Sequence, residues 1–408
     1  MLPFQLNSKI SLRSALSGMA LIGSLIVALI AAASCQMPPP MQVLSTASTP
    51  IKTVAFGVQL PDERAIAFVS EGRQPGNLDI WLMDLNTNTS VSITVDEAQD
   101  TQPRWSRDGR YLAFRSQWSD HHSSIRVYDT ATGHLNEVDP GDNPYDFDWL
   151  PDSQGLVYSN GEFQIKHLYF SGKPGDTVVE RGHAPHISPD GRQMAFVGSG
   201  PNDIGERLAM VEAETGAVNT VVDDPNRPEQ GYVVGGFDWS TDNGRLVESR
   251  WGGRYSVPLI VIYDADLNST AVLNSAPFVE PDQLGYGTNF CSPSWLPGSS
   301  DVSFVFQPED SPQFCTGKLY VSDKELTTPY PLVPGEDFAS PAPSPDGRLI
   351  VVTRGFYQAG GNVVGSYRGR ESSIWIMNRN GSDLTLLTDA PGYDGEATWR
   401  PTDSQLSN

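Results

Sequence analysis

The stretch PRWSRDGRYLAF, from Pro103 to Phe114, decides the fold of this 408-residue chain because variants of it recur along most of the sequence. In most copies, Pro-Asp-Gly or a similar trio supplies a preset φ, an Asx-type hydrogen bond and a position with φ > 0, which predicts a tight turn between two strands. Repeats with a period of about 20 to 50 residues indicate stacked units. The other copies are FDWLPDSQGLVY from Phe147, PHISPDGRQMAF from Pro185, FDWSTDNGRLV from Phe237, PSWLPGSSDVSFVF from Pro293 and PAPSPDGRLIVV from Pro341.

A third and a fourth strand are predicted after each turn. β-branched and aromatic runs that stop at Asp, Glu or Asn predict the third, as in IWLMD from Ile80, and shorter runs such as SVSIT from Ser90 predict the fourth. We therefore predict an all-β fold, a seven-bladed β-propeller of four-stranded antiparallel blades, with six or eight blades as the alternatives. The aligned second-strand positions are Phe68, Phe114, Tyr158, Phe196, Glu248, Phe304 and Val352, spaced 38 to 56 residues apart.

The two ends of the repeat region predict how the ring closes. The first unit has only a weak opening phrase, VAFGVQLPDERAIAF from Val54, whereas EATWRPTDSQ from Glu396 is an opening phrase with no later strands. We expect the last phrase to complete the first blade, so that the ring has no exposed sheet edge. The alternative is a frayed C-terminal tail.

The repeats resemble those of TolB-type propellers, whose pattern P-x-W-S-P-D-G-x-x-I-A-F is followed by I-Y-V-M-D and L-T. The resemblance covers about residues 54 to 402, but Leu296 to Ser299 lack the Asp-Gly turn, and Ile187 and Pro343 replace Trp. It implies the fold and a role in binding a protein or peptide. Such propellers also serve as substrate-gating domains of peptidases and as carbohydrate lyases, so the repeat is weak evidence for function.

The N-terminal residues predict export from the cytoplasm. Lys9 and Arg13 precede an apolar stretch from Met19 to Ala33, which is the pattern of a signal peptide over residues 1–34. A plainly secreted protein and a retained, uncleaved anchor are the alternatives to the lipid anchor proposed next.

Cys35 directly follows small residues, which resembles the lipobox of bacterial lipoproteins, although Ala32 stands where Leu is usual. We expect Cys35 to carry lipid that anchors the protein in the bacterial cell envelope. Residues 35–53 are rich in Pro, Ser and Thr and should form a flexible tether. Residues 54–408 are then the propeller domain.

The other two cysteines, Cys291 and Cys315, agree with an oxidising compartment. They flank the first two strands of one unit, and antiparallel geometry returns both to the same rim of the ring. We expect a disulfide between them. The alternative is two separate buried thiols.

The charge balance excludes one class of partner. Without the predicted signal peptide the chain has 25 basic and 49 acidic residues, a net charge of −24. It lacks the basic stripe that displaces counterions from phosphates, so we expect no binding of nucleic acid. We expect a monomer that contacts the membrane through its lipid and binds a protein or peptide, with a basic partner favoured by the charge.

The lengths of the connections predict which face of the ring binds. The first-to-second and third-to-fourth turns share one rim and are tight, whereas the second-to-third loops and the blade-to-blade connections share the other and are long. Binding residues concentrate on loops that a rigid scaffold positions. The alternative role for the acidic, aromatic and arginine residues of these loops is solvation, turn formation and packing within the loops. The predicted partner-binding residues are Trp251, Arg254, Tyr255, Tyr286, Phe356, Tyr357, Tyr367, Arg368, Asp100, Asp142, Asp337 and Asp394.

Signatures of catalysis are sparse, since no G-x-S-x-G nucleophile elbow occurs. A resemblance to propeller-type oligogalacturonate lyases implies a metal ion bound by histidines, but the histidines of this chain lack the spacing found in a zinc-binding helix. We expect a non-catalytic envelope lipoprotein with no cofactor. A carbohydrate-active or metal-dependent propeller enzyme, similar to polysaccharide lyases, is the alternative. The weak metal candidates are His121, His122, His183 and His186.

Overall fold

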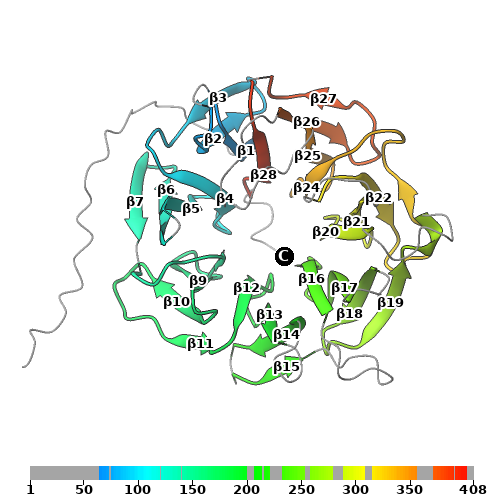
Figure 1. Cartoon of the computed structure of the whole chain (residues 1–408), viewed down its shortest axis with the longest axis horizontal. Coiled ribbons are helices and arrows are strands. Elements are labelled where there is room, and N and C mark those ends of the chain that lie inside the picture. Colours follow the sequence, from blue (N-terminus) through cyan, green and yellow to red (C-terminus); the bar gives the residue numbers. More distant parts are fainter. Residues whose placement is uncertain are drawn as a thin grey trace, which may run out of the picture. The chain divides into compact units, whose positions relative to one another are not determined.

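Seven four-stranded antiparallel blades surround a central axis, so the predicted seven-bladed β-propeller is confirmed (Figure 1). The first strand of each blade lies nearest the axis and the fourth lies outermost. The structure is a computed structural model. It describes residues 64–72, 75–119, 121–138, 140–199, 206–213, 216–220, 232–252, 258–278, 288–307, 315–355, 371–389 and 391–401.

Each blade follows the strand pattern predicted from the repeats. From the axis outward, blade 1 contains β28 (Asp394–Trp399), β1 (Ala65–Ser70), β2 (Asp79–Asp84) and β3 (Thr89–Ser92), and blade 2 contains β4 (Gln99–Trp105), β5 (Tyr111–Ser119), β6 (His122–Asp129) and β7 (His134–Val138). Blade 3 contains β8 (Phe147–Trp149), β9 (Gly155–Ser159), β10 (Ile165–Tyr169) and β11 (Thr177–Val179), and blade 4 contains β12 (Gly182–Ile187), β13 (Gln193–Ser199), β14 (Glu206–Glu212) and β15 (Val218–Thr220). Blade 5 contains β16 (Tyr232–Trp239), β17 (Arg245–Gly252), β18 (Leu259–Asp264) and β19 (Ser269–Asn274). Blade 6 contains β20 (Asn289–Trp295), β21 (Val302–Gln307), β22 (Lys318–Ser322) and β23 (Tyr330–Pro331), and blade 7 contains β24 (Ala339–Pro343), β25 (Leu349–Gly355), β26 (Ser372–Asn378) and β27 (Thr385–Leu386).

The last strand closes the ring. β28 pairs antiparallel with β1, with Trp399 opposite Ile66 and Asp394 opposite Ser70. Blade 1 is thus built from both ends of the repeat region, as the sequence predicted. A single further pairing, Glu206 with Tyr232, joins blades 4 and 5 into one eight-stranded sheet.

The repeated phrase forms the same hydrogen-bonded turn in several blades. In blade 2, the Ser106 hydroxyl donates to Asp108 Oδ1 at 2.5 Å and accepts from the Tyr111 N–H at 2.8 Å. Glycine is required at Gly347 for two reasons. Its φ is +67°, and a Cβ at this position would lie 1.9 Å from the Pro297 carbonyl oxygen of blade 6. The same Ser–Asp bond recurs at Ser188 with Asp190, Ser240 with Asp242, and Ser344 with Asp346.

The core is a ring of seven hydrophobic clusters, one at each seam between neighbouring blades. The seam between blades 1 and 2 contains Leu82 and Phe114, and the seam between blades 5 and 6 contains Ile262 and Phe304. Because each blade buries both faces, a second strand can be buried without alternation, as in β1. The core therefore lies between blades, and each blade is stabilised by packing against its neighbours.

Tryptophan side chains of the repeat tie three of these seams together. Each indole N–H donates to a backbone carbonyl on the innermost strand of the preceding blade. Buried indole N–H groups need such a partner, so the bond fixes the spacing of the two blades near the axis. The bonds run from Trp149 to the Arg104 carbonyl at 2.9 Å, from Trp239 to the His186 carbonyl at 3.0 Å, and from Trp399 to the Ala342 carbonyl at 2.8 Å.

Carboxylates tie three other seams. β4 bulges between Thr101 and Arg104, and the Gln102 N–H there bonds to Glu396 of blade 1 rather than to the sheet. Burial raises the pKa of Glu396 despite this bond. Indole and carboxylate seams therefore alternate around most of the ring. The carboxylate bonds are Glu396 with the Gln102 N–H at 2.8 Å, Asp148 with the Ile187 N–H at 2.8 Å, and Asp238 with the Trp295 N–H at 2.9 Å.

The predicted disulfide is present in blade 6, where Cys291 of β20 is bonded to Cys315, just before β22. The pair encloses a chain segment with a sequence separation of 24 residues. We expect a Cys291→Ser, Cys315→Ser variant to lose about 3 kcal/mol of unfolding free energy, because the unfolded chain regains the entropy of that loop. Urea unfolding of both proteins measures this, with reduced wild type as the control. An unchanged midpoint would contradict the expectation.

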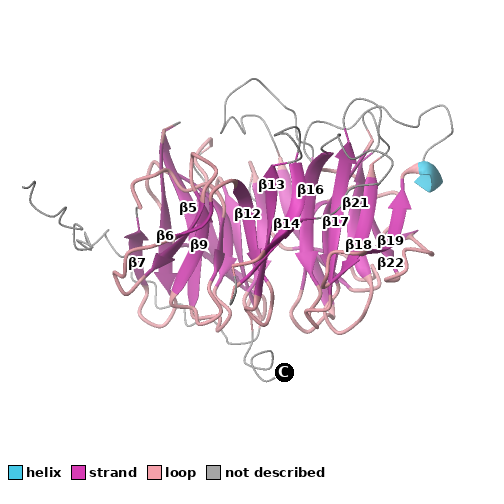
Figure 2. Ribbon diagram, turned by 90° about the horizontal axis from the view of Figure 1, so that it is seen from below, coloured by secondary structure: helices cyan, strands magenta, loops and turns pink. Residues whose placement is uncertain are grey.

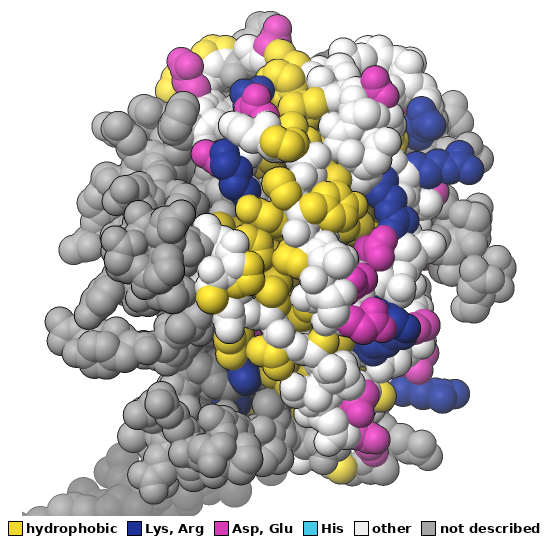
Figure 3. Space-filling model, turned by 90° about the vertical axis from the view of Figure 1, so that its right-hand side faces the viewer, with side chains coloured by type: hydrophobic (Ala, Val, Ile, Leu, Met, Phe, Trp, Pro, Cys, Tyr) yellow, Lys and Arg dark blue, Asp and Glu magenta, His cyan; other side chains and the backbone are white. Residues whose placement is uncertain are grey.

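The outer wall of the ring is less uniformly polar than the net charge suggests. Figure 3 shows a band of hydrophobic side chains along the wall at the right-hand side of Figure 1. On the outermost strands Val272, Tyr330 and Leu386 are more than two fifths exposed. Figure 3 also shows Lys, Arg, Asp and Glu side chains on both sides of the band.

Candidate functional site

The strands run between two rims of different construction (Figure 2). We call the rim with the first-to-second and third-to-fourth turns the turn rim, and the rim with the second-to-third loops and blade-to-blade connections the loop rim. The turn rim includes the Ser–Asp turns of blades 2, 4, 5 and 7. The described segments of the loop rim include residues 75–78, 93–98, 140–146, 160–164, 180–181, 332–338 and 387–389.

Within the described segments of the loop rim, three large aromatic side chains are exposed. Trp118 at the end of β5 is 41% exposed, Tyr145 before β8 is 52% exposed, and Phe163 between β9 and β10 is 60% exposed. Aromatic residues of this size are usually buried or at interfaces. These three were not among the residues predicted from the sequence.

Each exposed ring lies against a basic or imidazole side chain of a neighbouring strand. The Arg126 guanidinium lies 4.7 Å from the centre of the Trp118 ring, and the Arg115 guanidinium lies 5.0 Å from the centre of the Tyr145 ring. The rings of Phe163 and His183 are 5.9 Å apart, edge to face. These contacts orient one face or edge of each ring and leave the remainder open.

The three rings lie at consecutive seams. Trp118 belongs to the face of β5 that meets blade 1, since it shares that face with Phe114 of the seam cluster between blades 1 and 2. Tyr145 contacts Arg115, which lies on the opposite face of β5, at the seam between blades 2 and 3. Phe163 of blade 3 contacts His183 of blade 4. The rings therefore lie along an arc over blades 1 to 4.

A buried ion-pair cluster supports the Trp118 end of the arc. Arg126 is only 1% exposed, and its Nη1 lies 2.7 Å from Asp96 Oδ2 and 3.9 Å from Asp100 Oδ2. Asp100 is fully buried and accepts a hydrogen bond from the Ser116 hydroxyl at 2.5 Å. The cluster fixes the Arg126 side chain on which the indole of Trp118 rests.

Two carboxyl groups in or beside this cluster have perturbed acidity. Burial raises the pKa of Asp100 to about 7, although the Ser116 hydroxyl and the Arg126 charge oppose the shift. Burial likewise raises the pKa of Asp79 to about 6, against the hydrogen bond from the Thr94 hydroxyl. Both groups change charge near neutral pH. Perturbed pKa values gather at functional sites and also in structural ion-pair networks.

Asp142, a predicted partner-binding residue, organises the loop that carries Tyr145. Its Oδ2 accepts hydrogen bonds from Lys166 Nζ at 2.7 Å, the Tyr158 hydroxyl at 3.2 Å and Asn160 Nδ2 at 3.2 Å. Burial and the Asp142 charge raise the pKa of Tyr158, so this phenol stays protonated as a donor. Asp142 is thus a structural centre of the blade 3 loop.

The other three predicted acidic residues differ in exposure. Asp337 lies on the surface and pairs with Lys318 at 2.8 Å. Asp394 is 2% exposed, and burial raises its pKa against hydrogen bonds from Ser70 and Thr388. Asp100 is buried as described above. The side chains of Asp100 and Asp394 lie beneath the rim surface, so they support the site from below.

The histidine candidates do not form a metal site within the described ranges. His183 Nε2 lies 3.6 Å from Glu206 Oε1, and Glu206 also accepts the Val234 N–H at 2.9 Å. The bond to His183 lowers the pKa of Glu206. His186 packs near Phe237, while His121 and His122 are exposed. Among the described residues no group of three or more His, Cys, Asp or Glu side chains is arranged to hold a metal ion.

Most of the predicted aromatic and arginine contacts lie outside the described residues. The structure places the backbone of Trp251 in β17, paired with Val233, but not its side chain. Cys35 and the predicted signal peptide and tether also lie outside the described ranges. Those ranges contain no helix long and apolar enough to cross a bilayer. The predicted loop residues outside the described ranges are Arg254, Tyr255, Tyr286, Phe356, Tyr357, Tyr367 and Arg368.

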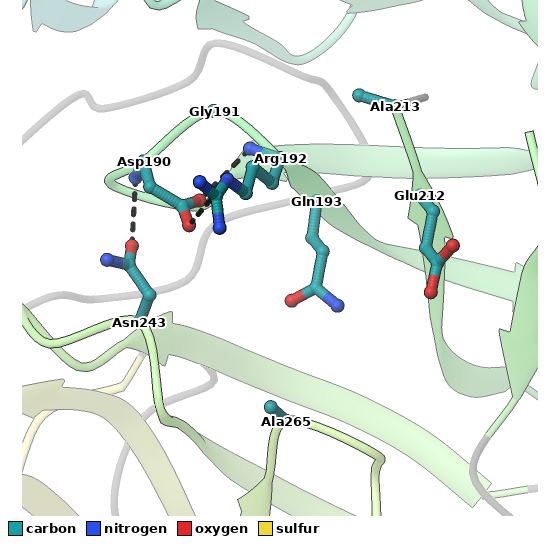
Figure 4. Close-up of a pocket in the computed structure, with 8 residues that line it drawn as sticks. All are labelled: Asp190, Gly191, Arg192, Gln193, Glu212, Ala213, Asn243 and Ala265. Carbon is teal, nitrogen blue, oxygen red and sulfur yellow. Dashed lines mark hydrogen bonds and ion pairs between the residues drawn. The ribbon is translucent and has the colours of Figure 1, made fainter. Parts of the chain in front are cut away.

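A cleft of about 640 Å³ lies on the turn rim at the seam of blades 4 and 5 (Figure 4). The Asp190 N–H donates to Asn243 Oδ1 at 2.8 Å, and Asp190 Oδ1 accepts from Ser188 and from the Arg192 N–H. The polar groups of Asp190 are thus engaged in hydrogen bonds of the turn, and we favour the loop rim as the candidate site. The cleft is lined by Asp190, Gly191, Arg192, Gln193, Glu212, Ala213, Asn243 and Ala265.

These observations define a seven-bladed β-propeller protein with an aromatic and acidic loop rim. No protein family profile matches the chain. The chain is 30% identical over 126 residues to the uncharacterized peptidase YuxL of Bacillus subtilis strain 168, a match that covers 29% of this chain and 19% of that protein. The chain thus aligns with well under two thirds of that relative's length.

Solved structures similar to this chain include several kinds of propeller protein. A prolyl endopeptidase has a TM-score of 0.55 at 12% identity, covering 83% of this chain and 49% of that chain. An oligogalacturonate lyase in complex with manganese has a TM-score of 0.50 at 13% identity, covering 80% and 85%. TolB from Acinetobacter baumannii has 0.46 at 17% identity, covering 83% and 82%. At these identities the similarity shows the fold alone. TolB proteins, predicted from the repeats, are among these neighbours.

Trp118 and Tyr145 lie in or beside segments that the sequence assigns to the loop rim, but the sequence patterns did not single out these rings. Trp118 lies within the stretch QWSDHHSS from Gln117, and Tyr145 lies two residues before the FDW phrase of blade 3. The missed signal was an aromatic residue at a strand end or in a connection, beyond the positions that the repeat reserves for core side chains. The burial of Asp100 required knowledge of strand pairing, because Asp100 lies opposite Ser116 on the seam-facing side of β4.

Proposed function

We propose that this protein is a non-catalytic cell-envelope protein whose propeller binds a protein or peptide through the loop rim. The observation that carries the proposal is the exposure of Trp118, Tyr145 and Phe163 on that rim. Aromatic and Arg side chains dominate the energetics of interfaces. Backbone and side-chain contacts orient these rings before any partner arrives, so little entropy is lost on binding.

We also propose that the chain is exported and held at the membrane by lipid on Cys35. The proposal rests on the signal-like residues 1–34 and on the small residues before Cys35. It implies that the ring works outside the cytoplasm, where the disulfide of blade 6 persists. A Cys35→Ser variant should leave the membrane fraction, and membrane retention of this variant would refute the anchor.

The binding proposal is tested by site-specific photocrosslinking in intact cells. A photoreactive amino acid at Phe163 should form adducts with a partner protein, because this ring is the most exposed of the three. The same group at Tyr330, which is 52% exposed on the outer wall, is the matched control and should form few adducts. Equal adducts at both positions, or none at Phe163 or at Trp118, would refute the proposal.

The alternative enzyme is tested on the same purified protein. Stoichiometric bound metal, together with cleavage of an acidic polysaccharide that a His121→Ala, His183→Ala variant loses, would favour a lyase-like enzyme. The exposed acidic rim disfavours this alternative because it repels a polyanionic sugar. We expect neither metal nor cleavage.

A further inference from the structure

We propose that the arc over blades 1 to 4 binds an extended segment of a partner protein that carries Lys or Arg side chains at intervals. This inference rests on the proposed function and names the partner's chemistry and its course across the rim. The geometric basis is the regular placement of one exposed ring at each of three consecutive seams.

The course along the rim follows from how the rings are held. The loop that carries Tyr145 is fixed to blade 2, because Pro144 O accepts from Ser123 Oγ at 2.7 Å and from Arg115 Nε at 3.1 Å. The loop that carries Phe163 is fixed to blade 4, because the Gly182 N–H donates to the Phe163 carbonyl at 2.7 Å. Both loops are therefore positioned partly by a neighbouring blade, blade 2 for Tyr145 and blade 4 for Phe163. A segment that crosses the seams meets rigid rings at a spacing set by the ring of blades.

The charge of the partner follows from the side chains beside the rings. Glu97, Glu162 and Glu180 are exposed along the arc. Basic side chains there are engaged with the protein itself: Arg126 pairs with Asp96, Lys166 pairs with Asp142, and the exposed Arg181 also has an interaction partner. Exposed rings beside exposed carboxylates favour ammonium and guanidinium groups, through cation–π contacts and charge.

An extended shape suits this arrangement better than a folded domain or a sugar. The exposed rings lie at separate seams, and extended chain advances about 3.3 Å per residue, so side chains several residues apart can reach successive seams. An acidic oligosaccharide would place its carboxylates against Glu97, Glu162 and Glu180. The arc therefore selects a cationic peptide over an anionic ligand.

The test measures binding of labelled synthetic peptides to the full-length protein by fluorescence anisotropy. The probes are a 14-residue peptide of alternating Lys and Thr and a matched peptide of alternating Glu and Thr. We expect the Lys peptide to bind, to weaken as salt rises, and to bind at least tenfold more tightly than the Glu peptide. Preference for the Glu peptide, or no binding of either at millimolar concentration, would overturn the proposal.

Variants locate the binding. Trp118→Ala, Tyr145→Ala and Phe163→Ala should each weaken Lys-peptide binding about three- to thirty-fold, since each removes one cation–π face. Tyr330→Ala on the outer wall is the matched control and should bind as wild type. Unfolding midpoints of all variants show whether a loss comes from misfolding, and the three single variants keep the test decisive if one of them fails to fold.

The two proposals fail in different ways. If photocrosslinks from the loop rim occur while the three ring variants bind the Lys peptide as wild type, partner binding stands and the cationic-segment inference falls. If no crosslinks form but the Lys peptide binds through the three rings, the proposed recognition of cationic segments is supported and the proposed partner binding in the cell is refuted.

Discussion

Replacing Arg126 with Met is expected to lower the free energy of unfolding by about 3 to 5 kcal/mol at pH 8, because removing one member of a buried ion pair leaves the other charged groups without compensation. Arg126 is 1% exposed and pairs with Asp96 at 2.7 Å, while the fully buried Asp100 lies 3.9 Å away. Met preserves most of the side-chain volume, so the loss reports charge more than packing. Urea unfolding at pH 8 measures the effect.

The deficit should shrink on acidification, and this distinguishes charge from packing. A carboxyl whose pKa is higher in the folded protein than in the unfolded chain binds its proton more tightly when folded, so stability rises as pH falls toward the unfolded pKa of about 3.9. Burial raises the pKa of Asp100 to about 7 and of Asp79 to about 6. From pH 8 to pH 5 the wild type should gain stability. The Arg126→Met variant should gain more, because Asp100 loses the cation that favoured its charged form.

A double variant provides the control. Asp100→Asn in the Arg126→Met background removes the uncompensated charge and should recover part of the lost stability while flattening the pH dependence. Below about pH 4 carboxyls with lowered pKa values oppose the gain. Asp242, whose pKa the Ser240 hydroxyl and the Gly244 N–H hold low, is one of them. A deficit of equal size at pH 8 and pH 5 would show that packing, not charge, explains the variant.

Replacing Trp399 with Ala should be as damaging, with an expected loss of about 3 to 5 kcal/mol, because it removes a large buried side chain from the strand that closes the ring. Trp399 is 8% exposed and belongs to the cluster with Ile66 and Val351. Its indole N–H donates to the Ala342 carbonyl at 2.8 Å, which joins blade 1 to blade 7. Unfolding followed by circular dichroism measures the loss.

The Trp399→Phe variant separates the hydrogen bond from the packing. It keeps an aromatic ring in the cluster but leaves the Ala342 carbonyl without its indole donor, and we expect about 1 to 3 kcal/mol of loss. In the Ala variant, amide exchange should also accelerate first in β1 and β28, because the closing pair opens before the other blades. Uniform exchange throughout the ring would contradict a local opening at the closure.

The repeated local chemistry explains why the fold could be predicted from sequence. Ser106, Asp108 and Gly109 make their turn within a few residues, so the signal is complete in any short stretch. The predicted second-strand positions from Phe68 to Val352 all fall on second strands. The closure of blade 1 and the pairing of Cys291 with Cys315 followed from counting strands and cysteines, which needs topology but no side-chain packing.

The candidate site required the assembled ring, because its contacts cross between blades. Whether Asp100 faces solvent depends on its partner across the sheet, Ser116, and on Arg126 beneath it. Whether Trp118 is core or surface depends on how far β5 extends past the neighbouring blade.

The sequence by itself determined the strand order, the turns and the number of blades, since each is specified by residues that touch within one repeat. Only the tertiary structure decided which rings remain open at the seams and which carboxyls are buried. Those properties belong to pairs of neighbouring blades, whose contacts join residues far apart in the sequence, 294 positions apart in the bond between the Gln102 N–H and Glu396.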